Sequence, residues 1–341
     1  MKLLIVGSDK IYAIENYYVK YLRQVGLNVS LFTAQSIFYD YYQKGLVNKL
    51  YYKLGISGIL NNINRLFKEA VETFKPTVIW IFKGMEIYPE SLRWAKSKGI
   101  RLISYNPDNP FIFTGKGSGN NNVIKSLPMY DLHFTYNFTI EKRLRDQFKV
   151  ITAYLPFGFE LSDELFNECV LQPEVIKVCF LGNPDKQRAD FIAKLAQNGI
   201  EIDLYGTNWD NYVRHPNLSI FKSVYGNDLW KVLRRYRVQL NLMRIHNEDS
   251  HNMRSFEVPG VGGIMVAPDT TEHRFFFTDK KEVFLFSDMN DCVQIIKEIL
   301  LLTPEEANKI RDKTRVRSIL SGYGYKERAG YALKIMEQWY G

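Results

Sequence analysis

Hydrophobic and polar positions alternate in blocks along the whole chain. Short apolar runs are followed by longer segments in which apolar residues recur at helical spacing. This order is typical of parallel strands joined by crossover helices, and runs without a polar face indicate strands covered on both sides of a sheet. In the N-terminal half the pattern predicts strands over Lys2–Val6, Asn28–Thr33, Thr77–Phe82, Arg101–Tyr105, Leu132–Thr135 and Val150–Tyr154.

Residues that start and stop helices mark the predicted helices of the N-terminal half. A proline in the first turn and a glycine just after the last turn are favoured, and proline also ends helices. By these signals helices are predicted over Ile14–Val25, Ile59–Phe74 and Pro89–Lys98. Between the first two lies an aromatic cluster, which we expect to pack as an irregular insertion, with a sugar-stacking or lipid-facing patch as the alternative; it comprises Phe38, Tyr39, Tyr41, Tyr42, Tyr51 and Tyr52.

A hinge is predicted at Leu155–Phe159, where Pro and Gly occur together and an irregular segment follows up to Pro173. The alternation then restarts. It predicts strands over Lys177–Leu181, Glu201–Tyr205, Val238–Met243, Gly263–Val266 and Glu282–Phe286. It predicts helices over Gln187–Asn198, Asp228–Arg235, Met289–Leu301, Pro304–Leu320 and Tyr325–Trp339.

The predicted fold class is therefore α/β, with two Rossmann-like doubly wound domains facing a cleft. The expected domains are residues 1–155, residues 156–324, and a C-terminal helix over 325–341 that crosses back to the first domain. In open parallel sheets, ligands bind outside the carboxyl ends of the strands, and a hinge places two such edges face to face. The length of 341 residues suits two domains of ordinary size.

Composition narrows the classes of protein. With 46% hydrophobic and 24% charged residues the chain is globular, and no run approaches the roughly 18 apolar residues of a spanning helix, so any membrane contact is expected to be peripheral. The net charge of +8 is compatible with nucleic acid, an anionic membrane or a phosphorylated substrate. The densest cationic clusters are predicted to be solvated helix faces and not a nucleic-acid platform; they are Arg234, Arg235 and Arg237, then Arg311, Lys313, Arg315 and Arg317.

The three cysteines have a spacing that suits neither a zinc site nor a disulfide framework, which indicates a reducing compartment. They are Cys169, Cys179 and Cys292, and Cys179 is expected to be a small buried apolar residue. Asp288 and Asp291 are three positions apart at a predicted helix start, where capping is the expected role in place of metal binding.

Candidate chemistry concentrates in the stretch from His251 to Val266, where Glu257 lies in a short helix that glycines follow. Helix N-termini favour anions, so Asn252 and Arg254 could hold a phosphate there, and Glu257 could accept hydrogen bonds from a ribose diol. The alternative is that Glu257 only complements the helix dipole and Arg254 only caps a surface.

In the N-terminal half, Asp108 follows a predicted strand, where it either faces the cleft or forms a turn. His133 lies in an apolar strand and is expected to be a core histidine. The Gly- and Asn-rich stretch Gly115–Asn122 is expected to be a mobile loop and an acceptor lid.

The order of motifs in the second half resembles CgeB-like (spore maturation protein-like) glycosyltransferases, within the group 1 or family 4-like transferases of the GT-B type. The resemblance covers about residues 150–340 and is weaker before them, where it rests on Tyr105–Pro110. Its carriers are Asn-x-Arg-x-Phe-Glu-x-x-x-x-Gly-Gly from Asn252, then Glu282–Asp288, Val178–Asn183 with Arg188, Asp203–Trp209 and Leu155–Gly158.

The resemblance implies a nucleoside-diphosphate-sugar donor on the C-terminal domain. Glu257 matches the family's ribose-binding glutamate, the second of two acids eight positions apart. The first falls on Asp249, where those enzymes more often carry Glu, and the neighbouring Glu248 could substitute. The candidate catalytic residues are Asp249, Asp108 and Arg254. The candidate donor-binding residues are Glu257, Asn252, Arg188, Lys186, Gly182, Asn183, Gly206, Ser255 and Phe256.

By the same resemblance, the expected activity is transfer of a sugar to a glycan, lipid or protein acceptor, with retention and without a metal or cofactor. The expected location is the cytoplasm, and peripheral contact with the inner face of the membrane is kept open. Three alternatives remain: a two-lobed protein that binds a nucleotide sugar or glycan without transferring it, an epimerase of the same fold, and a nucleic-acid-binding protein suggested only by the charge.

Overall fold

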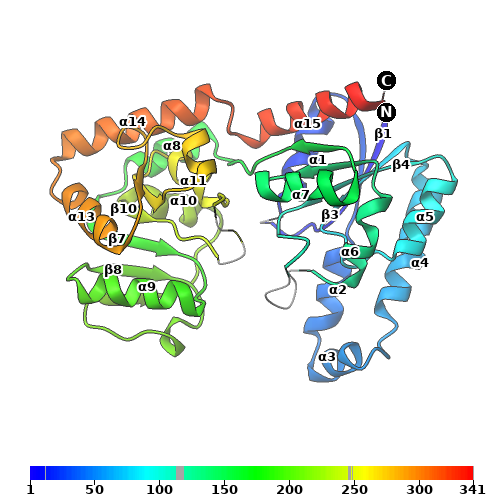
Figure 1. The fold of residues 1–341 in the computed structure, drawn as a ribbon, viewed down its shortest axis with the longest axis horizontal. Helices are drawn as coiled ribbons and strands as arrows, with labels where there is room; N and C mark the ends of the chain where they lie inside the picture. Colours follow the sequence, from blue (N-terminus) through cyan, green and yellow to red (C-terminus); the bar gives the residue numbers. More distant parts are fainter. Residues whose placement is uncertain (12, 113–118, 245–246, 248, 341) are drawn as a thin grey trace. The chain divides into compact units, whose positions relative to one another are not determined.

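The computed structural model describes residues 1–11, 13–112, 119–244, 247 and 249–340, and it divides into two compact units. Unit 1 comprises Met1–Pro156 and the chain from Arg328 onward, and unit 2 comprises Phe157–Glu327. Each unit contains a parallel six-stranded sheet with flanking helices (Figure 1). The units thus divide after residues 156 and 327, against 155 and 324 in the sequence-based prediction.

The sheet of unit 1 has the strand order β2-β1-β3-β4-β5-β6. Its strands are β1 (Lys2–Val6), β2 (Asn28–Phe32), β3 (Val78–Phe82), β4 (Arg101–Asn106), β5 (Leu132–Thr135) and β6 (Thr152–Tyr154). Its helices are α1 (Glu15–Gln24), α2 (Ala34–Gln43), α3 (Leu46–Lys53), α4 (Ile59–Phe74), α5 (Pro89–Ser97), α6 (Asn121–Ser126), a 3-10 turn at Leu127–Met129 and α7 (Phe138–Phe148). The closing helix, α15 (Tyr325–Tyr340), joins this unit from Arg328.

Strand β3 shows why this sheet needs helices on both faces, because all five of its side chains are buried. Ile79 and Ile81 lie in one apolar cluster with residues of α4 and α5. Trp80 points to the other face and packs edge-on against Tyr18 of α1, with ring centroids 4.8 Å apart. An unbroken apolar run is therefore the sequence signature of this central strand.

The sheet of unit 2 has the order β12-β11-β10-β7-β8-β9. Its strands are β7 (Val175–Leu181), β8 (Ile202–Tyr205), β9 (Leu218–Phe221), β10 (Tyr236–Leu240), β11 (Met265–Pro268) and β12 (Phe284–Phe286). Its helices are α8 (Asp163–Val170), α9 (Lys186–Gln197), a 3-10 turn at Trp209–Asn211, α10 (Gly226–Arg235), α11 (Arg254–Gly260), α12 (Thr271–Phe276), α13 (Met289–Leu300) and α14 (Pro304–Leu320). Its core joins α9 and α13 to β7, β8 and β10.

The predicted fold class is confirmed: both halves are doubly wound parallel sheets. Each predicted strand is present, Lys2–Val6 and Leu132–Thr135 with the predicted bounds and the others with shifted ends. The largest shifts are in unit 2, where Val238–Met243 is Tyr236–Leu240 and Gly263–Val266 is Met265–Pro268. Strand β9 was missed because it is a short edge strand with half-exposed side chains. The segment predicted to be irregular up to Pro173 contains helix α8, whose N-cap is Ser162.

The aromatic cluster between β2 and α4 is not an irregular insertion, because it forms helices α2 and α3. Phe38 of α2 stacks with Tyr42 and meets Tyr52 of α3 edge-on, with centroid distances of 5.6 and 4.8 Å. These rings join the two helices to each other and to the apolar cluster of unit 1.

The prediction of solvated arginine faces is wrong for Arg237 and Arg311, which are buried. Both guanidinium groups pair with Glu174, at 2.7 and 2.5 Å. The hydrogen bond from Arg237, and to a smaller extent the charge of Arg311, hold the pKa of Glu174 well below its usual range, at about 2. Through Glu174, Arg237 of β10 and Arg311 of α14 therefore connect these two elements to the start of β7, and neither arginine faces solvent.

Several smaller predictions are also settled. Asp288 is the N-cap of α13 and accepts from the Asp291 amide, as expected. All three cysteines are buried thiols without a disulfide partner. Of the predicted loop Gly115–Asn122, residues 115–118 lie outside the described part, whereas Asn120 caps α6, and Asn122 lies within that helix. The last residues of that stretch are thus helical.

Candidate functional site

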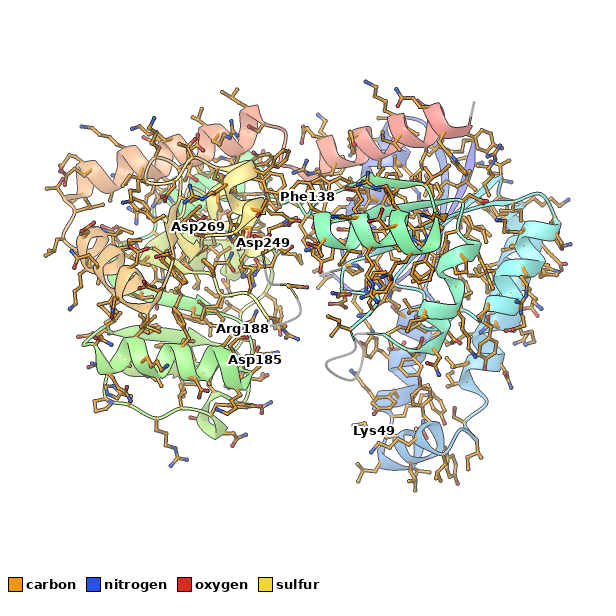
Figure 2. All side chains as sticks on the ribbon, in the orientation of Figure 1. Lys49, Phe138, Asp185, Arg188, Asp249 and Asp269 are labelled. Carbon is orange, nitrogen blue, oxygen red and sulfur yellow. The ribbon has the colours of Figure 1, made fainter. Side chains whose placement is uncertain are left out.

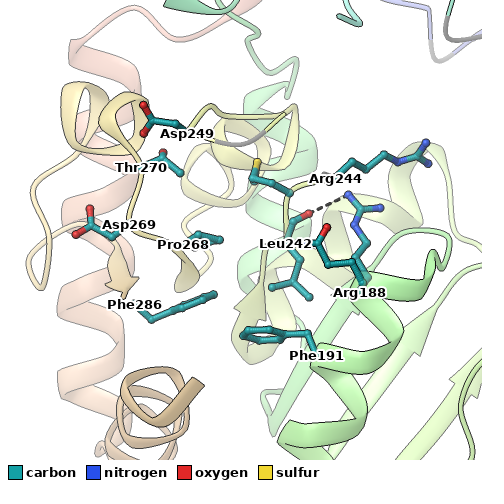
Figure 3. Close-up of a pocket in the computed structure, with 11 residues that line it drawn as sticks. Arg188, Phe191, Leu242, Arg244, Asp249, Pro268, Asp269, Thr270 and Phe286 are labelled. Carbon is teal, nitrogen blue, oxygen red and sulfur yellow. Dashed lines mark hydrogen bonds between the residues drawn. The ribbon is translucent and has the colours of Figure 1, made fainter. Parts of the chain in front are cut away.

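A pocket of about 300 Å³ lies at the carboxyl edge of the sheet of unit 2 (Figure 3). It is bounded by the first turns of α9, by the segments that follow β10 and β11, and by Phe286 at the end of β12. This is the point where the strand order reverses between β7 and β10, which is where doubly wound sheets bind ligands. The lining residues are Gln187, Arg188, Phe191, Leu242, Met243, Arg244, Asp249, Pro268, Asp269, Thr270 and Phe286.

One wall of the pocket is apolar. Phe191 and Phe286 are stacked with ring centroids 5.4 Å apart, and Leu242 and Pro268 lie beside them. A mainly apolar recess with a few polar groups is typical of small-molecule sites, and this volume is at the small end of their range. It suits the planar ring of a nucleobase better than a whole nucleotide sugar.

Arg188 supports the other wall. Its Nη2 donates to the Leu242 carbonyl at 2.9 Å (Figure 3), and its Nη1 donates to the Asn183 carbonyl at 3.4 Å. Burial lowers the pKa of Arg188 to about 10. The guanidinium therefore remains charged at neutral pH, and it fixes the segment after β10 against α9.

Arg244 lies at the exposed rim of the same pocket, close enough to Arg188 to contribute to the lowering of the Arg188 pKa. Among the described residues, no carboxylate forms an ion pair with Arg244. The backbone amides of Lys186 and Gln187, at the start of α9, also find no acceptor in the described part of the chain. Arg188 is engaged by two carbonyls and lies 3.6 Å from the Asp185 carboxylate. Arg244 and the two free N–H groups beside the pocket therefore form the candidate site for an anion.

Asp249 lines the pocket from the side opposite Arg188, as Figure 3 shows. Its backbone is in the left-handed region, with φ 54°, which is uncommon for a residue with a side chain. Its carboxylate accepts from the amide of Thr271 at 2.6 Å, at the N-terminus of α12. The predicted catalytic acid is thus at the pocket, but it already caps a helix. Glu248 lies outside the described residues.

The residues of α11 form a separate group that does not line this pocket. Arg254, the first residue of the helix, pairs with Glu257, whose side chain is almost fully buried. Asn252 donates to the Asn241 side chain at 2.8 Å and caps Ser255. Two roles were expected for Glu257: it accepts hydrogen bonds from a ribose, or it complements the dipole of its helix. Both remain predictions.

A buried polar network holds this region in place. His251 contacts the Glu272 carboxylate through Nδ1 at 2.5 Å, and its Nε2 accepts from the Phe157 amide at 3.3 Å. Ser255 contacts His273 Nε2 at 2.8 Å, and burial lowers the pKa of His273 to about 4. Phe256 is wholly buried among aromatic rings, which makes it a packing residue. The network thus ties α11 to α12.

Three further candidates lie at the ends of β7 and β8. The carbonyl of Gly182 accepts from Trp209 Nε1 at 2.9 Å. A Cβ on Gly206 would overlap that carbonyl oxygen, so glycine at position 206 permits the close approach of the two backbones. Asn183 Oδ1 accepts from the backbone and hydroxyl of Thr207, both at 3.0 Å. These contacts shape the edge of the sheet next to α9.

The last two predicted residues also do not line the pocket. Lys186 is exposed on α9 and pairs with Asp190 at 2.6 Å. Asp108 lies in unit 1, where Lys83 Nζ contacts its carboxylate at 2.5 Å. Lys83 also has a left-handed backbone, with φ 65°.

Around Lys83 the carboxyl edge of unit 1 holds buried acids. Burial raises the pKa of both Glu15 and Glu86 to about 7, and the nearby Lys83 opposes this rise. His133 is a core histidine, as expected: its Nε2 contacts the Leu127 carbonyl at 2.8 Å, and burial lowers its pKa to about 4.

Sequence reasoning missed several lining residues, among them the polar Gln187, Arg244, Asp269 and Thr270. A signal existed for Arg244, Asp269 and Thr270, because they come shortly after predicted strands, and the carboxyl ends of parallel strands gather ligand-binding groups. The buried network was missed because Glu272 and His273 are far from His251 in the sequence.

In the described part of the chain, no three His, Cys, Asp or Glu side chains lie together in a metal-binding arrangement. The helices described also include none with the length and hydropathy needed to cross a bilayer.

One protein family and several solved structures are similar to this chain. Residues 186–334 match a family described as "Glycosyl transferase-like". No curated protein sequence matches the chain.

Solved structures of low sequence identity share the fold over nearly all of both chains. Sucrose-phosphate synthase from Thermosynechococcus elongatus is 13% identical, with a TM-score of 0.70, covering 100% of this chain and 99% of that one. Anabaena Alr3699/HepE in complex with UDP-glucose is 11% identical, with a TM-score of 0.65 and coverage of 99% and 100%. A putative UDP-N-acetylglucosamine 2-epimerase from Listeria monocytogenes is 11% identical, with a TM-score of 0.59 and coverage of 99% and 96%. The chain therefore has the GT-B fold, and its residues 186–334 match the glycosyl transferase-like family.

Proposed function

We propose that this protein transfers a sugar from a nucleoside-diphosphate-sugar donor, bound to unit 2, to a glycan, lipid or protein acceptor. The observation that carries the proposal is the pocket at the switch point of the second sheet, where an apolar wall lies next to Arg188 and Arg244. This combination suits a nucleobase and an adjoining diphosphate. The complex of Alr3699/HepE with UDP-glucose supports the same class of donor.

In the proposed reaction, negative charge builds on the diphosphate as the bond to the sugar breaks. Fixed cations and helix N–H groups aimed at that charge lower the barrier, because they need no reorganisation. Arg244 and the first amides of α9 have this role in our proposal, while Arg188 holds the segment that carries Arg244. Asp249, which lines the pocket, contacts the ribose or the sugar in our proposal.

The finer assignments rest on the resemblance to CgeB-like transferases. They are a ribose contact by Glu257, retention of the anomeric configuration, independence from metals and cofactors, and a cytoplasmic location. Asp108 and Lys83 of unit 1 are the proposed groups on the acceptor side, since both lie at the carboxyl edge of the first sheet.

One observation favours a second candidate, a protein that binds a nucleotide sugar without transferring it. The carboxylate of Asp249 already accepts from the Thr271 amide, so one of the two acids that the resemblance requires is engaged in structure. An epimerase is the third candidate, because a putative epimerase shares the fold.

A thermal-shift screen tests the donor site. The chain is heated with UDP, GDP, ADP and CMP and their common sugar conjugates, with and without EDTA. Ligands that bind only the native state raise the melting temperature. We expect one nucleotide family to do so, insensitive to EDTA, and to lose most of the effect in Glu257→Ala. No shift at millimolar concentrations would contradict the donor site.

Incubation of the shifting donor then separates the candidates. Sugar transferred only when an acceptor is added indicates the transferase. A changed sugar on the nucleotide without an acceptor indicates the epimerase, and an unchanged donor with every acceptor class indicates the binding protein.

A further inference from the structure

Helix α3 of unit 1 contains no buried residue. Its outer side and the turn after it form a patch of aliphatic residues, here named the α3 face. The members, with their exposed fractions, are Leu46 (82%), Val47 (57%), Leu50 (53%), Leu54 (62%) and Ile56 (65%). Single exposed apolar residues are ordinary, but five that follow one another along a short segment require an explanation.

The helix presents these side chains in one direction. Leu46, Leu50 and Leu54 are four positions apart, so they follow one stripe of the helix. The other side is fixed to the unit by Tyr52, which packs edge-on against Phe38 of α2. In Figure 1, α3 lies at the far end of α2 and α4, away from the sheet of unit 1. The α3 face is thus held outward on an ordered support.

The charge around the α3 face has one sign. Lys44, Lys49 and Lys53 lie on or next to the helix, and the sequence contains no acidic residue between Asp40 and Glu69. Lys49, labelled in Figure 2, lies 5.6 Å from the centre of the Tyr42 ring, which steadies it without neutralising it. Exposed aliphatic side chains therefore alternate with uncompensated cations.

We propose that the α3 face docks on the surface of an anionic phospholipid bilayer. Leucine and valine side chains enter the boundary between headgroups and acyl chains, while the lysines meet the lipid phosphates. Tyr51, exposed on the same helix, is a residue type that favours this boundary. A second copy of the chain fits less well, because a symmetric contact would bring the same lysines together.

Vesicle flotation tests the proposal with the full chain. The protein is mixed with vesicles of phosphatidylcholine alone or with 30% phosphatidylglycerol, and the fraction that floats is measured. We expect flotation only with the anionic vesicles. The double variant Leu50→Glu/Leu54→Glu should bind at least about tenfold more weakly, because two aliphatic contacts are lost and two negative charges face the lipid.

A matched control is the double variant Leu171→Glu/Leu301→Glu, which makes the same charge change at exposed leucines of unit 2. It should float like the wild type. Replacing Lys44, Lys49 and Lys53 by Gln should weaken binding roughly fivefold for each lysine, whereas the same change at the exposed Lys297, Lys309 and Lys313 should have a smaller effect.

Three outcomes would overturn the proposal. One is the absence of flotation with any vesicle. Another is an equal loss of binding in the α3 variants and their controls, which would indicate attraction by net charge alone. The third is a dimer in lipid-free buffer, measured by light scattering, that Leu50→Glu/Leu54→Glu dissociates, because the α3 face would then bind a second copy. None of these outcomes depends on whether the chain binds a nucleotide.

Discussion

The two sheets have the same construction but opposite chemistry at their carboxyl edges. In unit 2 the switch point between β7 and β10 opens into a pocket of about 300 Å³ beside Arg188 and Arg244. In unit 1 the switch point lies between β1 and β3, where the carboxyl group of Glu15 packs against Gly7 and Lys83 pairs with Asp108.

The difference is one of charge balance as well as space. At the pocket of unit 2, Arg188 lies 3.6 Å from the Asp185 carboxylate, whereas Arg244 has no acid bound to it among the described residues. Arg244 is therefore the cation of that edge that is open to an anion. At the edge of unit 1, Lys83 is neutralised by Asp108, and a cavity next to it has a volume of only about 20 Å³, room for about one water. The fold determines where a ligand edge lies, and the side chains determine whether it is open.

The largest effect is expected at Gly206, where the edge of unit 2 depends on a close backbone approach. In Gly206→Ala the new Cβ would overlap the Gly182 carbonyl and lie 2.7 Å from Trp209 Nε1. Backbone cannot move aside cheaply, so the free energy of unfolding should fall by about 3 kcal/mol or more, measured by urea denaturation. Nucleotide binding should weaken as well.

The control for this change is Gly330→Ala on α15, where a Cβ meets nothing within 4 Å. Removing a helical glycine should raise the free energy of unfolding by about 0.5–1 kcal/mol. Equal effects of the two substitutions would show that the backbones of β7 and β8 do not approach as described.

The next largest effect distinguishes unit 1 by its response to pH. Because burial raises the pKa of Glu15 from 4.5 to about 7, the folded state disfavours the charged carboxylate. The wild type therefore loses stability as pH rises from 4.5 through 7, whereas Gln at this position does not titrate. The stability of Glu15→Gln relative to the wild type should increase by up to about 3 kcal/mol between pH 4.5 and 8.

Urea denaturation at several pH values measures this difference, and the constant effect of the changed hydrogen bond to Ser8 cancels within it. Glu69→Gln, on the exposed surface of α4, is the control and should change little over the same range. A pH-independent difference for Glu15→Gln would mean that this edge is more open to water than its burial indicates.

The third prediction tests the charge difference between the two edges. Arg244→Gln removes the rim cation of unit 2 and should weaken nucleotide binding by about 10- to 100-fold, the range for a lost charged hydrogen bond. Lys83→Gln removes one positive charge at the edge of unit 1 and should leave nucleotide affinity unchanged. Isothermal titration calorimetry with the nucleotide selected by thermal shift measures both. Similar losses in both variants would place the anion site elsewhere.

The architecture could be predicted from the sequence because the central strands are unbroken apolar runs. The run from Val78 to Phe82 is apolar at every position, which only a sheet covered on both faces requires. The edge strand β9, with alternating half-exposed residues, carries no such signal. The helices α2 and α3 were missed because neither has a buried apolar stripe: α2 buries only Ala34 and Ser36, and α3 contains no buried residue.

The candidate site was predictable only in part. Motif spacing led to Arg188 and Asp249, both at the pocket. The same reasoning made Lys186 a candidate donor-binding residue, and that side chain is exposed on α9, where it pairs with Asp190. A linear pattern does not specify which side of a helix a residue takes, nor which distant residues complete a network. The pairing of Arg237 with Glu174 could not be predicted, because the two residues are far apart in the sequence.

The smallest effect concerns Asp249, which belongs to both the pocket and the scaffold. Asp249→Ala removes the acceptor of the Thr271 amide, so the free energy of unfolding should fall by about 1 kcal/mol, as for other lost helix caps. Asp249→Asn keeps an acceptor oxygen, so its free energy of unfolding should fall by less.

Turnover separates the two roles of Asp249. If the carboxylate only caps α12, turnover of the two variants should follow their stability. If it also contacts the donor, both should lose turnover while Asp249→Asn remains stable. Turnover that survives in both Asp249→Ala and Glu257→Ala would show that neither acid serves the donor, and the open edge of unit 2 would then bind its anion through cations alone.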